Sequence, residues 1–167
     1  ITTALVSDVP GFSWGIVSAL AHSGVKYFAS APNTGDRIGY VLQDWGDKPF
    51  YWKSQSGEEK VLMWVAGAGY SSFHEGDLTR LGDQKLLKLM RKLDDSGYPY
   101  EILQLPYTVG GDNGTPDPNL PDFVKKWNER YDSPRLIIGT HAQMFSELEK
   151  RYGSTLPAYQ GDFTPYW

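Results

Sequence analysis

The amino-acid sequence predicts an α/β fold with a largely parallel sheet, flanking helices and a β-hairpin insertion. Segments with the period of amphipathic helices alternate with short apolar runs that have the length of strands. Such alternation is typical of βα units around a parallel sheet. The 167 residues are enough for one domain with a sizeable core. We therefore treat residues 1–167 as one segment of a globular domain.

Four helices are expected, each with apolar side chains along one face. Gly24, Gly97 and Gly153 follow three of them, and glycine is common just after the C-terminus of a helix. Pro121 stands in the first turn of another, where the missing N–H group has no helical partner in any case. The expected helices span residues 14–22, 83–96, 121–131 and 142–152.

Strands are expected where apolar residues run between these helices, at residues 4–6, 25–29, 101–105 and 136–138. A different pattern occupies residues 38–70, where aromatic and β-branched runs at 40–42, 50–52 and 61–65 are separated by turn residues. We interpret this stretch as a β-excursion of hairpins inserted into the α/β core.

The composition excludes several classes of function. The chain has no cysteine, so it has no disulfide framework, no thiolate zinc site and no cysteine nucleophile. The net charge of -4 gives no reason to expect a nucleic acid or an anionic membrane as partner. No stretch approaches the roughly 18 apolar residues that span a bilayer. The 6 Trp, 11 Tyr and 7 Phe residues suit sugar faces and wet interfaces, and equally suit core packing.

Two carboxylates are expected at the C-terminal ends of strands. Asp8 follows the apolar run 4–6, and Asp112 lies in a Gly- and Asp-rich loop after the run 102–107. In parallel α/β folds these strand ends share one edge of the sheet, where reacting groups gather. Paired carboxylates are what glycoside hydrolysis requires. Both aspartates also fit plain turns, so the spacing leaves a structural role open.

The histidines do not predict a complete metal site. His22, His74 and His141 are scattered along the chain, and none has the i, i+4 spacing of a helical zinc pair. A structural role is the ordinary expectation for each.

The order of several motifs resembles glycoside hydrolase family 38, the retaining α-mannosidases, over nearly the whole chain. The form Asp8-Val9-Pro10-Gly11 is most similar to the bacterial branch of that family. The matching segments, in order, are Ser7 to Trp14, Gly24 to Phe28, Met63-Trp64, Tyr107 to Asn113, Thr140-His141 and Gly161 to Tyr166. The resemblance implies that the chain is an internal segment of a catalytic domain built as a distorted β/α barrel.

The resemblance also implies a mechanism. Asp8 matches the family's nucleophile, which is at the same time a zinc ligand. The family carries its acid/base in a Gly-Asp-Asp motif, whereas Gly111-Asp112-Asn113 stands here. Either Asp112 serves as the acid/base, or that group lies elsewhere, or this branch of the family differs in chemistry. We expect Trp14, Trp64 and Asn113 to contact the sugar.

The resemblance places the remaining zinc ligands outside this chain, as a His-x-Asp pair before Ile1 and a His after Trp167. We therefore expect zinc to be bound in the full-length parent and not to be held by this segment. Its expected partners are a mannose-containing glycan and the other domains of the parent chain. A catalytically inert carbohydrate-binding relative, or a structural segment that packs against those domains, is the alternative. The compartment is not determined by the sequence; our expectation leans to the bacterial periplasm or the cell exterior.

Overall fold

The computed structural model describes residues 1–33, 44–67, 69–70, 82–107, 109 and 114–164. The chain forms two compact units. Residues 1–72 and 140–167 make up the first, here the sheet unit, and residues 73–139 make up the second, here the helical unit.

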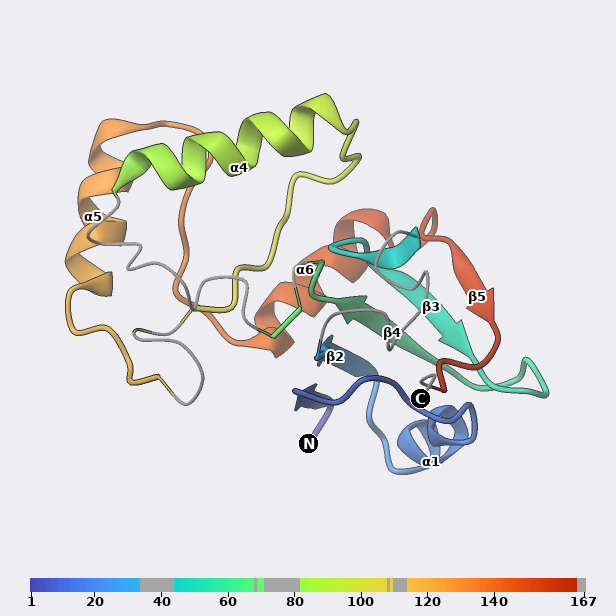
Figure 1. Ribbon diagram of the computed structural model, residues 1–167. Helices are drawn as coiled ribbons and strands as arrows, with labels where there is room; N and C mark the ends of the chain where they lie inside the picture. Colours follow the sequence, from blue (N-terminus) through green and yellow to red (C-terminus); the bar gives the residue numbers. More distant parts are fainter. Residues whose placement is uncertain (34–43, 68, 71–81, 108, 110–113, 165–167) are drawn as a thin grey trace. The chain divides into compact units, whose positions relative to one another are not determined.

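The sheet unit contains a five-stranded sheet in the order β1-β2-β4-β3-β5 (Figure 1). The first three strands of this order run parallel, β3 is antiparallel to β4, and β5 is parallel to β3. The α/β fold class with a mostly parallel sheet is thereby confirmed. The strands are β1 (Thr3–Ser7), β2 (Tyr27–Ala31), β3 (Phe50–Lys53), β4 (Lys60–Val65) and β5 (Ala158–Gln160).

The β-hairpin expected within residues 38–70 is formed by β3 and β4, and its place in the fold differs from the expectation. It is no excursion beside the core, because β4 pairs with β2 and lies in the middle of the sheet. The pattern of burial agrees with this central position, because Val61 to Val65 are all buried, as in a strand covered on both faces. The expected strand at 40–42 lies outside the described residues.

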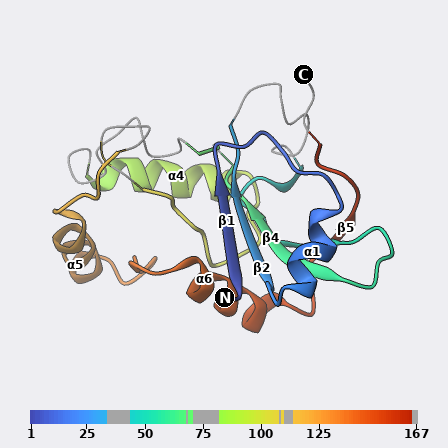
Figure 2. The ribbon, with the colours of Figure 1, turned by 90° about the horizontal axis from the view of Figure 1, so that it is seen from below.

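Two helices cover opposite faces of this sheet. Alternate residues of a strand point to opposite faces, so Phe28 and Met63 pack with Val17 of α1 (Ile16–His22). Their neighbours Ala29 and Trp64 pack with Phe145 of α6 (His141–Tyr152). Figure 2 shows β1, β2 and β4 side by side. The α6 helix begins with a capping box, in which Thr140 and Gln143 bond each other's backbone N–H groups.

The helical unit contains α4 (Asp83–Asp95) and α5 (Leu120–Arg130). Leu86 and Trp127 form its buried core. The Asp83 carboxylate, in the first turn of α4, accepts hydrogen bonds from Arg130 Nη1 at 2.7 Å and Tyr131 Oη at 2.9 Å. An acidic group at a helix N-terminus and a basic group at a C-terminus both suit the helix dipole.

The prediction of strands at residues 101–105 and 136–138 is wrong. Neither stretch pairs with a described strand, and Leu105 and Leu136 instead pack against the Leu86–Trp127 core. Ile137 and Ile138 are 84% and 58% exposed. A short apolar run has the length of a strand, but it becomes one only where a neighbour supplies hydrogen bonds. The four expected helices are confirmed, with shifts at their ends.

A carboxylate shared by two tyrosines joins α6 to the sheet. Glu149 accepts hydrogen bonds from Tyr27 Oη at 2.8 Å and Tyr51 Oη at 3.2 Å. Burial, with the hydrogen bond and charge of Glu149, raises the pKa of Tyr27 to about 12. The unfolded chain therefore loses this proton first, near its ordinary pKa of about 10.

Stability should thus fall as the pH rises from about 10 to about 12, because the unfolded state binds fewer protons there. The Tyr27→Phe variant should lose less unfolding free energy over this interval in urea titrations. Tyr159→Phe is the control, since no carboxylate bonds that hydroxyl among the described residues. An equal loss in both variants would show that Tyr27 does not sense Glu149.

Candidate functional site

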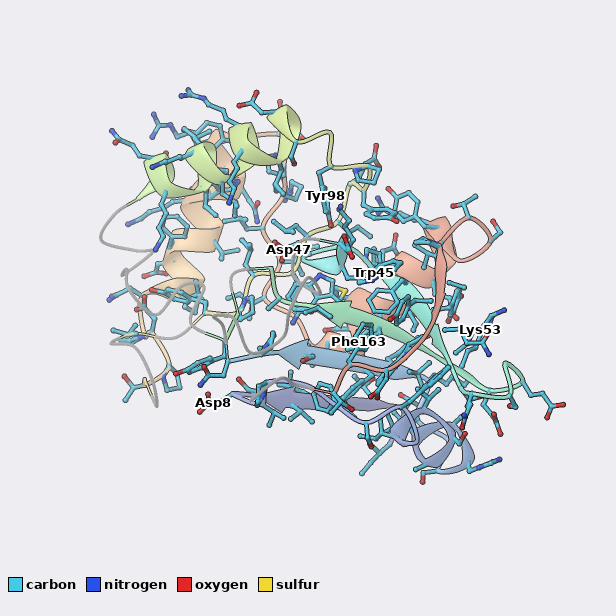
Figure 3. All side chains as sticks on the ribbon, turned by 45° about the vertical axis from the view of Figure 1, so that its right-hand side comes forward. Asp8, Trp45, Asp47, Lys53, Tyr98 and Phe163 are labelled. Carbon is cyan, nitrogen blue, oxygen red and sulfur yellow. The ribbon has the colours of Figure 1, made fainter. Side chains whose placement is uncertain are left out.

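Asp8 lies directly after β1, at the C-terminal end of the parallel strands. Its backbone N–H donates to the Ala31 carbonyl at 2.8 Å, and its φ of 61° lies in the left-handed region. That region costs most L-residues about 1–2 kcal/mol, and Asp tolerates it better than most. The turn brings the chain out of the sheet with the Asp8 side chain exposed. Figure 3 shows Asp8 and Lys53 at opposite ends of the sheet.

Asn33 is the hydrogen-bond partner of Asp8. Its Nδ2 donates to Asp8 Oδ1 at 2.6 Å, and an ionised carboxylate can only accept, which settles which end of the amide faces it. Among the described residues no other side chain bonds to this carboxylate. Asn33 follows β2, and the register pairs Ser7 with Ala31, so both chain exits leave the same edge.

A shallow apolar hollow adjoins this pair. Pro10, two residues after Asp8, and Pro32, which precedes Asn33, both line it, together with Phe12, Val65 and Phe163. The Phe12 N–H donates to the Phe163 carbonyl at 2.8 Å, which holds one wall of the hollow in place. The strand ends therefore place a charged group and an amide beside a small hollow lined by buried or half-buried apolar side chains.

A second aspartate near these strand ends has a structural role. Asp47 also has a positive φ, 60°, and its Oδ1 accepts from the Gly67 N–H at 2.9 Å. Its own N–H donates to the Val65 carbonyl at 2.8 Å. A Cβ at Gly67 would overlap Asp47 Oδ2, so this close approach requires glycine. Asp47 thus fixes the turn after β4.

The two tryptophans expected to contact sugar lie within the sheet unit. Trp64 is 2% exposed and packs in the core facing α6, so its ring offers no face to a ligand in this structure. Trp14 is half-buried, and its Nε1 donates to the Lys53 carbonyl at 2.8 Å, at the end of the sheet remote from Asp8. Its role in substrate binding stays a prediction that this geometry does not favour.

Asp112 and Asn113 lie outside the described residues, so the acid/base and sugar-binding roles stay predictions. The chain on either side of them is described within the helical unit. Val109 N–H donates to the Thr115 carbonyl at 3.0 Å, and Tyr107 Oη donates to Asp117 Oδ2 at 2.5 Å. The two ends of the loop are thus tied together.

The described residues do not form a zinc site by themselves. They contain no group of three or more His, Cys, Asp or Glu side chains that could hold a metal ion. Zinc in proteins takes at least three protein ligands, and Asp8 can supply one of them. Of the histidines, His22 lies 3.5 Å from Glu59, and burial lowers the pKa of His141. No described helix is long and apolar enough to cross a membrane.

Asn33 was not among the site residues predicted from the sequence. The feature of the sequence that could have indicated it is its position after the second strand. Parallel strands of equal length end at one edge of the sheet, so the residues that follow them become neighbours.

Comparisons with known proteins found one matching family and one similar fold. The sequence matches the glycosyl hydrolases family 38 N-terminal domain over residues 1–166. The fold is similar to that of an alpha-mannosidase from Enterococcus faecalis V583, with a TM-score of 0.73 and 12% sequence identity. The similarity covers 98% of this chain and 18% of that chain, so the chain spans less than a fifth of that protein. No curated protein matches the chain.

The left-handed backbone conformation at Asp8 should affect the unfolding free energy of variants at this position. Asp8→Gly and Asp8→Ala both remove the carboxylate and its bond to Asn33, but only glycine adopts a φ of 61° without strain. We expect the glycine variant to be more stable than the alanine variant by about 1 kcal/mol in urea unfolding. Equal stabilities, or a more stable alanine variant, would contradict the strained turn.

Proposed function

Because the chain belongs to the glycosyl hydrolase family 38 N-terminal domain family, we propose that it forms part of the active site of a retaining, zinc-assisted α-mannosidase. The observation that carries the proposal is the exposed Asp8 carboxylate, held by Asn33 at the C-terminal edge of the parallel strands. The chain spans 18% of the similar alpha-mannosidase, so the activity would belong to a longer protein that contains this segment.

Asp8 would act as the nucleophile of a double displacement. One of its carboxylate oxygens attacks the anomeric carbon while the bond from that carbon to the glycosidic oxygen breaks. Asp112 gives its proton to the departing oxygen and then removes a proton from water. That water attacks the anomeric carbon, the bond to Asp8 breaks, and the sugar leaves with its original anomeric configuration.

Zinc would be held by Asp8 together with ligands from outside this segment. When bound, the ion would orient the sugar hydroxyls and stabilise charge as the ring distorts. Among the described residues this chain would contribute the Asp8 carboxylate, because they contain no group of three or more ligating side chains.

A carbohydrate-binding relative without activity is the second candidate. It is favoured by Asn113, since an amide stands where the family places a second acidic residue and an amide cannot transfer a catalytic proton. Activity on an α-mannoside distinguishes the two candidates.

Asp8→Gly should abolish hydrolysis of 4-nitrophenyl α-mannoside by the full-length protein that carries this sequence, with a loss in kcat of at least about 10⁴-fold. Azide, an anion small enough to fill the space of the carboxylate, should restore release of nitrophenol. The product should be the β-mannosyl azide, because a single displacement inverts the anomeric carbon.

Asp47→Gly is the matched control, since Asp47 also has a positive φ but its carboxylate bonds backbone. It should keep hydrolysis and give no glycosyl azide. Unchanged activity of Asp8→Gly would remove Asp8 from the mechanism, and an inactive full-length protein with intact mannoside binding would favour the second candidate.

Asp112→Asn should slow hydrolysis more for substrates whose leaving group must be protonated than for those whose leaving group departs without a proton. An alkyl α-mannoside needs protonation of the departing oxygen, so its kcat/KM should fall by about 10²-fold or more, whereas a dinitrophenyl mannoside should lose much less in the first step. An equal loss for both substrates would show that Asp112 is not the proton donor.

A further inference from the structure

We propose that Asn33 is a positioning residue for Asp8: its amide holds Oδ1 and so directs the other carboxylate oxygen to the reacting carbon. This inference rests on the proposed role of Asp8 as nucleophile.

The backbone that carries Asn33 is held from both sides. On one side, Asp8 N–H donates to the Ala31 carbonyl at 2.8 Å. On the other side, Tyr70 N–H donates to the Pro32 carbonyl at 3.0 Å. Pro32 is itself buried and its ring fixes φ, which reduces the freedom of the chain as it leaves the sheet. The amide is therefore placed before any substrate arrives.

The contact suits a group that must act in one orientation. A carboxylate at a strand end can rotate about its Cα–Cβ and Cβ–Cγ bonds, and each orientation aims a different oxygen at the substrate. The bond from Nδ2 to Oδ1 at 2.6 Å selects one of them. Asn33 is half-buried, which limits competition from water for this bond.

The same bond continues to act after the first displacement. Once one Asp8 oxygen is esterified to the sugar, the other becomes a carbonyl oxygen, which can still accept from Nδ2. When the ester breaks, negative charge returns to the carboxylate, and a donor already in place stabilises that charge. Asn33 should therefore orient Asp8 in both displacements and stabilise its returning charge in the second, while touching only Asp8.

This role differs from a purely structural one, and the chain offers a structural asparagine for comparison. Asn128 donates from Nδ2 to the Leu136 carbonyl at 2.9 Å and accepts from the Leu136 N–H at 2.9 Å. Its amide joins two pieces of backbone in the helical unit. Loss of that amide should affect folding and leave the orientation of Asp8 alone.

The test is a double-mutant cycle in the full-length protein, with 4-nitrophenyl α-mannoside as substrate. Asn33→Ala should lower kcat by about 10²-fold, the usual effect of one preorganised donor, with KM changed by less than about threefold. The same substitution added to Asp8→Gly should leave the azide-rescued rate unchanged within about threefold, because azide has replaced the group that Asn33 positions. Asn33→Ser, with a smaller polar side chain, is a second variant if the alanine variant does not fold.

Asn128→Ala is the control, and it should change both rates by the same factor. A fall in the azide-rescued rate equal to the fall in kcat would show that Asn33 acts on the fold or on the substrate, and would overturn the inference while Asp8 kept its role. Unchanged activity of Asp8→Gly without azide would overturn the proposed function and this inference with it.

Discussion

The site depends on the parallel pairing of β1 with β2. The register aligns Ser7 with Ala31, so the two strands end together, and the hydrogen bond from Asp8 N–H to the Ala31 carbonyl continues the pairing one step further. A shift of this register by one residue would turn the strand residues to the opposite faces and separate Asp8 from Asn33. The buried Phe28 and Ala29 oppose such a shift, because they pack under different helices on opposite faces of the sheet.

Much of the fold was open to prediction because helical periodicity is a local property. The apolar face of α6 lies within one short segment, and this helix forms where it was expected. The prediction of strands at residues 101–105 and 136–138 was wrong because strand pairing is not local. An apolar run does not indicate whether a neighbouring strand will be present to pair with it. The central position of β4 escaped the sequence analysis for the same reason, although the unbroken burial from Val61 to Val65 agrees with it.

The site was predicted in part. Asp8 stood out because a carboxylate after an apolar run and before Pro-Gly marks a strand end. Asn33 did not, because its importance depends on which strands are neighbours. Trp64 shows the converse: an aromatic residue in a matching motif was expected to contact sugar, whereas the structure buries it under α6, and its role stays a prediction. Residue type alone does not separate a core ring from a binding ring.

At 12% identity to the alpha-mannosidase from Enterococcus faecalis V583, the shared feature is the fold, and the chemistry must be argued from the side chains. A full-length protein treated with a 5-fluoro α-mannosyl fluoride, which forms a slowly hydrolysed ester, and then digested for mass spectrometry tests that chemistry most directly. The account predicts one added fluorosugar on the peptide that contains Asp8. Labelling of a different carboxylate, with Asp8 unmodified, would contradict it.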